Sequence, residues 1–319
     1  MKVLVTGASG FAGSVVVPVL SKAGFEVHAT SRQKMTPAGV RHFVAADLAS
    51  SRPEDLLEGM DAVVHLAARA HVIGDRSKDL DATYSAANAE FTQRLAIAAH
   101  QQGVSHFVFC SSVKAMGEVT RTHPLSESDI PCPADAYGRS KLEAERALKR
   151  LSDVSRMAIT SLRPPLMYGA GVKGNLRRLM RMVQLGIPLP FSRISNRRSL
   201  LGVRNFGSAI SSVLGSPASG FRVFLLSDGE SISTPELIRK IAIAMHKQAR
   251  MFSVPQELLR FAALALRKTA EFERLTGSLV VDDGAFRNEY GWTQPYSLED
   301  GLKEMVDSFL AFHDLQRFS

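Results

Sequence analysis

The sequence predicts an α/β protein with a doubly wound parallel sheet, followed by a smaller C-terminal domain. Two observations carry this prediction. Over the first 165 residues, short β-branched and apolar runs alternate with helical patterns, which is typical of a parallel sheet with helices on both faces. After residue 165, glycine and proline become dense and the alternation stops, so a second and less regular part of the chain begins there.

The predicted strands of the first part are short and apolar, as strands buried on both faces should be. Pro18 stands inside the first helical pattern and removes a backbone donor, so we expect that helix to be distorted. The helical patterns cover residues 11–23, 86–102 and 137–151. The strands are expected at residues 2–6, 26–30, 40–46, 62–66, 105–110 and 158–163.

The second part contains one more strand-like run, at residues 223–226. We therefore expect a dinucleotide-binding domain over residues 1–168 and a mostly substrate-binding domain over residues 169–319, with segments at about 200–228 returning to the first domain. The helical patterns of the second part cover residues 175–184, 234–245, 256–275 and 297–312.

The composition is that of an ordinary globular protein, with 319 residues of which 45% are hydrophobic and 22% charged. The two cysteines, Cys110 and Cys132, are not clustered, so we expect no disulfide framework, no metal site and a cytoplasmic location. No signal peptide is expected before the first strand. The apolar run at residues 261–266 is too short to cross a membrane, so we expect no membrane association.

The formal net charge is +8, and its distribution is informative. Residues 154–227 contain no Asp or Glu but hold eleven basic residues, which fits a site for a polyanion such as a nucleotide-sugar diphosphate. A solvated basic face is the alternative. No aromatic residues are interleaved with the basic ones and no recognition-helix pattern is present, so we do not expect nucleic acid to bind.

A glycine turn joins the first strand to the first helix. Gly7, Gly10 and Gly13 let the backbone approach a pyrophosphate, and the start of the helix favours its negative charge. Phe11 and Ala12 belong to the same candidate cofactor site. A tight turn without any ligand is the alternative.

The end of the second strand helps to choose between cofactors. An acidic residue at this place usually holds the adenosine 2′-hydroxyl of NAD. Here the chain has Ser31 and Arg32, whose hydroxyl and guanidinium suit a 2′-phosphate. The sequence therefore favours NADP(H), with NAD(H) as the alternative.

Tyr137 and Lys141 lie four residues apart on a predicted helix, and hence on one face of it. A tyrosine is a poor acid or base at neutral pH, because it titrates near ~10. We expect the ammonium group of Lys141 to lower that pKa. Ser111 and Ser112 end the fifth strand, where a hydroxyl can hydrogen-bond a substrate oxygen.

Six motifs occur in an order that resembles the extended short-chain dehydrogenases/reductases, specifically the NAD-dependent epimerase/dehydratase family of nucleotide-sugar enzymes. The resemblance covers essentially the whole chain and implies a Rossmann-type sheet. The motifs are Thr6-Gly7-x-x-Gly10-Phe11-x-Gly13, Asp47-Leu48, His65-Leu66-Ala67-Ala68, Ser111-Ser112, Tyr137-x-x-x-Lys141, and the run from Leu162 to Gly169.

The resemblance implies a role for each matching position. Ser112 polarises the substrate, Tyr137 is the acid/base, and Lys141 assists it and binds the nicotinamide ribose. Asp47 and Leu48 contact the adenine. Leu66, Ala67, Ala68, Pro164 and Leu166 line the rest of the cofactor site. On the substrate side, Asn175 and Arg198 hold the diphosphate, and weaker candidates are Arg274 and Asp300.

The chain also departs from the family pattern. Val113 and Lys114 follow the serine pair where dehydratases have an acid and a base, so a dehydratase is disfavoured. A substrate-side aromatic residue is missing, and we expect Lys114 and His71 to shape the pocket instead.

Further stretches resemble one branch, the bacterial reductases that act at C4 of UDP-4-keto-6-deoxy-N-acetylhexosamines in surface-polysaccharide pathways. The cofactor preference favours this NADPH-dependent reductase. A UDP-glucose or UDP-N-acetylglucosamine 4-epimerase is the alternative, because it uses the same Ser112, Tyr137 and Lys141. A non-catalytic NADP-binding regulatory protein is the alternative of another class. The family also implies a homodimer formed through the helices at residues 86–102 and 137–151.

Overall fold

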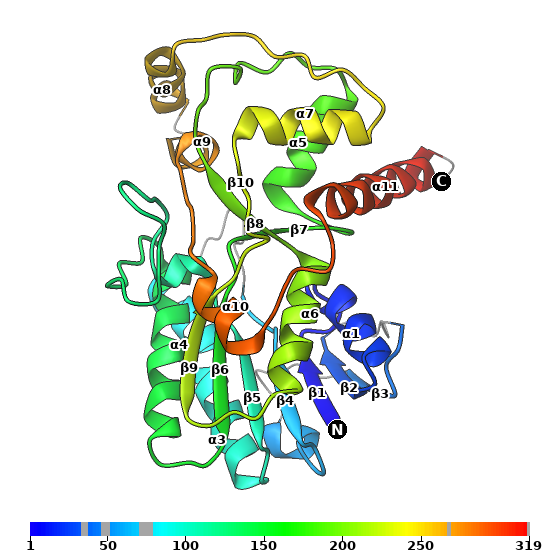
Figure 1. Ribbon diagram of the computed structural model, residues 1–319, viewed down its shortest axis with the longest axis vertical. Helices are drawn as coiled ribbons and strands as arrows, with labels where there is room; N and C mark the ends of the chain where they lie inside the picture. Colours follow the sequence, from blue (N-terminus) through cyan, green and yellow to red (C-terminus); the bar gives the residue numbers. More distant parts are fainter. Residues whose placement is uncertain (33–37, 46–51, 70–78, 267–268, 318–319) are drawn as a thin grey trace.

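The computed structural model describes residues 1–32, 38–45, 52–69, 79–266 and 269–317. Its larger layer is a parallel sheet of seven strands in the order β3-β2-β1-β4-β5-β6-β9 (Figure 1). This confirms the predicted fold class. The strands are β1 (Lys2–Thr6), β2 (Glu26–Ser31), β3 (His42–Ala45), β4 (Ala62–His65), β5 (His106–Cys110), β6 (Ala158–Arg163) and β9 (Phe221–Leu225).

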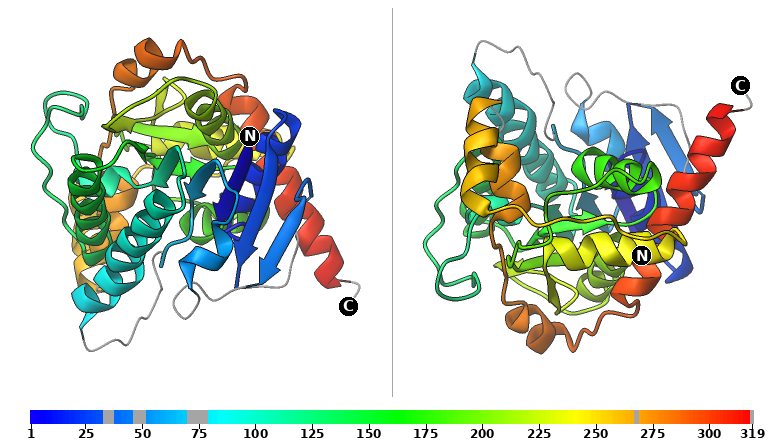
Figure 2. Two further views of the ribbon diagram at one scale, coloured as in Figure 1. Left: turned by 90° about the horizontal axis from the view of Figure 1, so that it is seen from below. Right: turned by 90° about the horizontal axis from the view of Figure 1, so that it is seen from above.

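Helices cover both faces of this sheet, as Figure 2 shows from two directions. On one face, α1 (Gly13–Lys22) and α6 (Val203–Leu214) bury Val17 and Phe206 in one hydrophobic core. On the other, α3 (Phe91–Gln101) and α4 (Ala136–Ser152) bury a second set of apolar side chains against the strands. The sheet is therefore closed off from water on both sides, and its ligands must bind at the ends of its strands.

Two helices of this part differ from expectation. The first runs from Gly13 to Lys22 with Pro18 inside it, so it is shorter at both ends than the predicted 11–23; the loss of one backbone hydrogen bond at the proline is outweighed by the burial of its apolar face. The second begins earlier than predicted, with α2 (Leu80–Tyr84) and a π-helical turn (Ser85–Glu90) leading into α3. The side chain of Asp79 caps α2 by accepting a hydrogen bond from the backbone N of Ala82, at 3.0 Å.

A second core lies above the carboxyl ends of the large sheet. A three-stranded sheet contributes to it, with the order β10-β8-β7, formed by Ser231–Ile232, Arg198–Gly202 and Leu166–Tyr168. These strands were not predicted, because they are short and carry no clear alternation. The helices of this core are α5 (Gly174–Gln184), α7 (Thr234–Ala244) and α11 (Leu298–Arg317).

The chain returns to the large sheet twice after leaving it. The first return is α6 followed by β9, which pairs with β6 at the edge of the sheet. The second is α10 (Gly284–Tyr290), where Phe286 and the following Trp292 pack into the same core as α1 and α6. The sequence indicated only the first of these returns.

Residues 256–275 form two helices rather than the single predicted one, namely α8 (Gln256–Ala265) and α9 (Thr269–Thr276). Two short 3-10 turns complete the elements, at Pro53–Leu56 and Val113–Ala115. Within the described residues, no helix is both long enough and apolar enough to span a bilayer. The same residues contain no group of three or more His, Cys, Asp or Glu side chains that could hold a metal ion.

Candidate active site

The turn between β1 and α1 is built so tightly that only glycine fits at two of its positions. Gly7 has φ of +72°, and a Cβ placed on it would lie 2.7 Å from the backbone N of Ala67. A Cβ on Gly13 would lie 2.3 Å from the carbonyl oxygen of Gly7. The backbone N of Gly10 donates to that same oxygen at 2.9 Å, which closes the turn directly before α1 begins.

Replacing Gly13 by alanine should open this turn, because the atoms that its Cβ would meet belong to the backbone and cannot swing away. We expect about 1–3 kcal/mol of lost stability and a fall of at least about tenfold in dinucleotide affinity. Thermal unfolding and dinucleotide titration measure the two effects. Gly215→Ala is the control, since its Cβ would make an ordinary 3.4 Å contact; an equal effect there would contradict the explanation.

The described residues around the turn fit a dinucleotide. The first turn of α1 contains no acidic residue that would repel a pyrophosphate. The hydroxyl oxygens of Thr30 and Ser111, at the ends of β2 and β5, are buried and have no protein hydrogen-bond partner among the described residues. Asp47, Leu48 and His71, which the sequence assigned to the cofactor or the pocket, lie outside the described residues.

Among the remaining predicted cofactor residues, Leu66 and Ala67 border the same turn. The backbone N of Leu66 donates to the carbonyl oxygen of Thr6 at 3.2 Å, and that of Ala67 to the Thr6 hydroxyl at 3.3 Å, with Ala68 following directly. Phe11 packs against the second core and Ala12 precedes α1. Pro164 is buried, whereas Leu166 is 41% exposed at the start of β7.

Ser31 and Arg32 differ in their surroundings. The Ser31 side chain is buried, and its hydroxyl forms a hydrogen bond with the hydroxyl of Ser9 in the glycine turn. The Arg32 side chain is exposed. Ser31 therefore joins β2 to the turn, and Arg32 is the more accessible of the two to a 2′-phosphate.

Ser112, Tyr137 and Lys141 meet at the carboxyl end of β5. The Ser112 side chain lies close enough to the Tyr137 phenol to lower its pKa. The Nζ of Lys141 lies 5.8 Å from the centroid of the Tyr137 ring and donates to the carbonyl oxygen of Cys110 at 2.7 Å. The structure thus brings together the three side chains that the sequence selected as catalytic.

The pKa of Tyr137 is raised above its ordinary value of 10.0, chiefly because the phenol is removed from water. The Ser112 side chain acts in the opposite direction but does not offset burial. The expected lowering by Lys141 is therefore not seen in the protein alone. Burial also lowers the pKa of Lys141 itself, because it disfavours the charged ammonium form. At neutral pH Tyr137 is a phenol and is ready to donate a proton.

The helix that carries Tyr137 and Lys141 is anchored from below by Glu145, on the same face one turn further on. Glu145 accepts hydrogen bonds from Nε and Nη2 of Arg163 at 2.9 and 2.5 Å, and from the hydroxyl of Ser161 at 3.0 Å. Both charged side chains are almost fully buried, at 3% and 6% exposure. This pair fixes α4 against β6 directly beneath the catalytic side chains.

Lys114 corrects an expectation. The sequence assigned it to the substrate, but its Nζ forms ion pairs with Glu118 and Asp135, each at 2.5 Å. The other carboxylate oxygen of Asp135 accepts from the backbone N of Gly138 at 2.8 Å and so caps α4. Lys114 therefore holds the start of the catalytic helix, because its charge is already matched by two carboxylates.

A buried polar network, which the sequence did not reveal, connects β1 to α4. His65 is hydrogen-bonded at Nδ1 to the hydroxyl of Thr6 (2.6 Å) and at Nε2 to that of Thr92 (3.1 Å). The Thr92 hydroxyl donates to the carbonyl oxygen of Asn88 at 2.5 Å. The Asn88 amide in turn donates to the Ser140 hydroxyl at 3.0 Å. The available signal was the i,i+4 pair of polar residues, Asn88 and Thr92, within an alanine-rich helix.

His65 should make the protein sensitive to acid. Burial lowers the pKa of His65 from 6.5 to about 3. Between these two pH values the imidazole is protonated in the unfolded chain but neutral in the folded one. Its contribution to stability is therefore complete above pH 6.5 and declines as the pH falls towards 3. The loss should reach about 3 kcal/mol by pH 4.

Urea unfolding at several pH values tests this expectation. His65→Gln should be less stable at pH 7, but it should lose less free energy of unfolding between pH 6.5 and 4 than the native chain does. Parallel pH profiles for the two proteins would show that His65 does not titrate on unfolding.

The predicted substrate residues lie in the second core and around it. Arg198, in β8, donates from Nη1 to the carbonyl oxygen of Gly277 at 2.9 Å. Burial lowers the pKa of Arg198. The carboxylate of Glu118 raises it, and the guanidinium group of Arg274 in α9 lowers it, so both of these charges act on Arg198. Asn175 is exposed in the first turn of α5.

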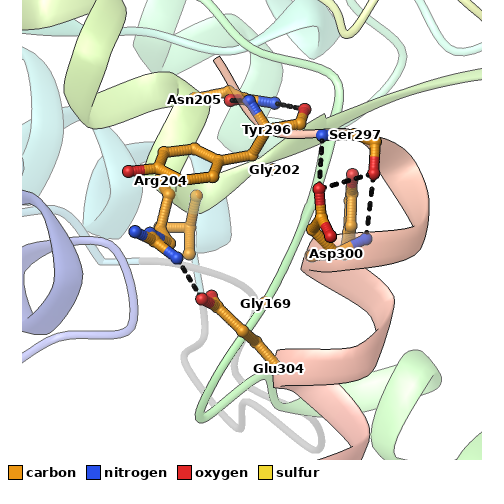
Figure 3. Close-up of a pocket in the computed structure, with 11 residues that line it drawn as sticks. Gly169, Gly202, Arg204, Asn205, Tyr296, Ser297, Asp300 and Glu304 are labelled. Carbon is orange, nitrogen blue, oxygen red and sulfur yellow. Dashed lines mark hydrogen bonds and ion pairs between the residues drawn. The ribbon is translucent and has the colours of Figure 1, made fainter. Parts of the chain in front are cut away.

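Asp300 belongs to a separate pocket between the starts of α6 and α11 (Figure 3). Its carboxylate accepts from the hydroxyl and the backbone N of Ser297, at 2.7 and 3.2 Å, and so caps α11. Across the pocket, Arg204 stacks 3.6 Å above the Tyr296 ring centroid and pairs with Glu304. None of Ser112, Tyr137 and Lys141 lines this pocket, and Asp300 has a structural role there.

The glycine turn, the serine–tyrosine–lysine group and the parallel sheet can now be compared with known proteins. The model of the NAD dependent epimerase/dehydratase family matches residues 3–225, from β1 to the end of β9. The chain belongs to this family. The match includes the cofactor turn and all three catalytic candidates, and it makes the protein an NAD(P)-dependent enzyme of the epimerase/dehydratase type.

Relatives and solved structures of this family resemble the chain over its full length. It is 37% identical to a UDP-glucose 4-epimerase of Vibrio cholerae over 97% of the chain and 95% of that protein. It is 27% identical to the N-acetyl-alpha-D-glucosaminyl-diphospho-ditrans,octacis-undecaprenol 4-epimerase of Escherichia coli O157:H7, over 94% and 92%. The structure of MoeE5 in complex with UDP-glucuronic acid and NAD superimposes with a TM-score of 0.80 at 25% identity, covering 98% of this chain and 100% of that one.

Proposed function

We propose that the protein is a UDP-sugar 4-epimerase that inverts the configuration at C4 of a UDP-hexose. The main support is the full-length similarity to a UDP-glucose 4-epimerase, combined with the contact between Ser112 and Tyr137 beside the dinucleotide turn. The sequence favoured a 4-keto reductase, but the relatives favour its alternative. Both reactions use the same three side chains, so the site geometry alone does not separate them.

Epimerisation at C4 requires a hydride acceptor and a side chain that moves a proton. The bound dinucleotide supplies a reversible hydride acceptor for C4. In its deprotonated form, Tyr137 would take the proton of the C4 hydroxyl during oxidation and return it to the same oxygen after the sugar has rotated, so no net proton is gained or lost. Ser112 hydrogen-bonds that oxygen, and Lys141 lies behind the phenol, where its charge stabilises the deprotonated form.

We infer that the resident cofactor is NAD. The Ser31 hydroxyl, on which a 2′-phosphate would depend, is buried and bonded to Ser9, which leaves Arg32 as the exposed donor. A resident NAD also suits an epimerase, which regenerates its cofactor in each turnover. Denaturing the purified protein and identifying the released dinucleotide by mass tests this; recovery of NADP would overturn it.

The substrate diphosphate is proposed to lie near Arg198 and Arg274. Arg198→Met should raise KM for the UDP-sugar about 10- to 100-fold, with kcat changed much less, because a hydrogen bond to a charged group contributes about 1.5–3 kcal/mol. The neighbouring Arg197→Met is the control, since Arg197 is exposed. Equal KM values for the two variants would place the diphosphate elsewhere.

The two reactions are separated by one pair of assays. Without added cofactor, the protein should interconvert UDP-glucose with UDP-galactose, or UDP-N-acetylglucosamine with its C4 epimer, as followed by proton NMR. Offered UDP-4-keto-6-deoxy-N-acetylglucosamine and NADPH, it should show no steady loss of absorbance at 340 nm. Steady loss of absorbance at 340 nm without interconversion of the UDP-sugars would support the reductase and contradict the epimerase.

A homodimer through α3 and α4 is also proposed, on the basis of the family resemblance. Ile97 of α3 is a large apolar side chain with 37% exposure, available for such a contact. Light scattering of the native chain and of Ile97→Glu measures it, and a monomeric native chain would contradict the proposal.

A further inference from the structure

One helix of the substrate-binding half turns its apolar side towards solvent. In α8, Leu258, Phe261 and Leu264 follow one another at helical spacing and are 59%, 69% and 63% exposed. Ala263 is the buried residue of the helix. An amphipathic helix of a globular protein normally buries such a stripe against the core. Here α8 lies at the end of the molecule farthest from the N-terminus (Figure 1).

The apolar surface extends beyond this helix. The segment leading into α8 runs beside the segment after α5, since the backbone N of Leu189 donates to the carbonyl oxygen of Arg250 at 2.9 Å and that of Phe252 to Leu189 at 3.0 Å. Of the sixteen exposed large hydrophobic residues in the described chain, seven lie in these two segments or in α8 and its C-terminal end. They are Leu185, Ile187, Phe252, Leu258, Phe261, Leu264 and Leu266.

Basic side chains accompany these apolar ones. Within residues 185–193 and 246–266, Glu257 is the single acidic residue, whereas Arg193, Lys247, Arg250 and Arg260 are all basic and exposed. None of the four forms an ion pair with a carboxylate of a described residue. We call the seven apolar and four basic residues the apolar–basic face.

We propose that the apolar–basic face docks the protein on the surface of an anionic phospholipid bilayer. Its phenylalanine and leucine side chains would enter the interface, and the arginine and lysine side chains would meet the phosphate groups. A second copy of this chain is the poorer occupant, because it would present the same unpaired positive charge and repel the first. The proposed association is peripheral, and it departs from the expectation of no membrane association, which considered only segments long enough to cross a bilayer.

Vesicle flotation tests the proposal with the full-length protein. The native chain should float with vesicles of phosphatidylglycerol and phosphatidylcholine, less in high salt, and not with phosphatidylcholine alone. The double variant Phe261→Ser, Leu264→Ser should partition at least about tenfold more weakly, because two large apolar side chains no longer insert. The matched control is Ile130→Ser, which removes an apolar side chain that is 89% exposed elsewhere and should leave partitioning unchanged.

The outcomes are decisive either way. Failure of the native chain to float, or an equal loss in the Ile130 control, would overturn the proposal. So would a concentration-dependent self-association that the double variant abolishes without any binding to vesicles, since a second copy would then cover the face. The thermal midpoint and the activity on a soluble UDP-sugar should be native in the double variant, which separates this test from the proposed function.

Discussion

Tyr137→Phe is expected to lower kcat about 10²- to 10⁴-fold, the usual contribution of a positioned acid–base group. Phenylalanine keeps the ring and removes only the hydroxyl, whose pKa is influenced by the neighbouring Ser112. KM and the bound dinucleotide should change little, because neither the glycine turn nor Arg198 is altered. Steady-state kinetics with a UDP-sugar and the absorbance of the purified protein measure the two effects.

Tyr84→Phe is the matched control. Its ring meets that of Tyr137 edge to face, with centroids 6.3 Å apart, and it is also buried. Loss of this hydroxyl should leave most of the activity. If Tyr137→Phe retained native turnover, Tyr137 would not be the acid–base group. If the native protein itself showed no turnover while binding the dinucleotide, a regulatory binding protein would be the better description.

Glu145→Ala should lower the free energy of unfolding by about 3–5 kcal/mol, the largest loss of stability expected here. The substitution leaves the guanidinium group of Arg163 buried and without its carboxylate, and it also removes the acceptor of Ser161. Chemical denaturation measures the effect. Because the catalytic helix loses its anchor on β6, activity should also fall at temperatures where the native chain is stable.

Two further variants test whether the lost stability comes from the unmatched buried charge or from a general weakening of the helix. Lys149→Ala breaks an ion pair with Asp153 on the same helix, but both partners are more than half exposed, so at most about 1 kcal/mol should be lost. The double variant Glu145→Leu, Arg163→Met removes both buried charges and should recover much of the stability. If the double variant were no better than Glu145→Ala, lost packing rather than an unmatched charge would be the cause.

The sequence predicted those features that depend on neighbours along the chain. The glycine turn follows β1 directly, and Tyr137 and Lys141 share one helix face, so spacing together with the family resemblance was enough to propose them. The short strands β7, β8 and β10 could not be found, because they owe their form to pairing partners such as Ser231 and Ser199, which are far apart in the sequence. A strand of two or three residues leaves no periodic pattern.

The same reason explains the errors at the site. Lys114 appeared to be a free cation, because nothing in the sequence shows that Glu118 and Asp135 fold around it. Ser31 appeared to be available to a phosphate, because its bond with Ser9 crosses from β2 to the glycine turn. The sequence favoured the reductase over its alternative, the epimerase that the relatives favour, for a different reason. The choice between them depends on whether the cofactor leaves after each turnover, which no single side chain encodes.

The double return of the chain to the large sheet also constrains how the protein can be made. A ribosome releases β1 to β6 first, but the outer edge of β6 stays open until residues 221–225 have emerged. The core beneath α1 and α6 is completed only with Phe286 and Trp292. Nearly the whole chain must therefore be synthesised before the first domain closes. An open strand edge on an unfinished sheet invites pairing with other chains, so the time between residues 163 and 292 is when this protein most needs a chaperone.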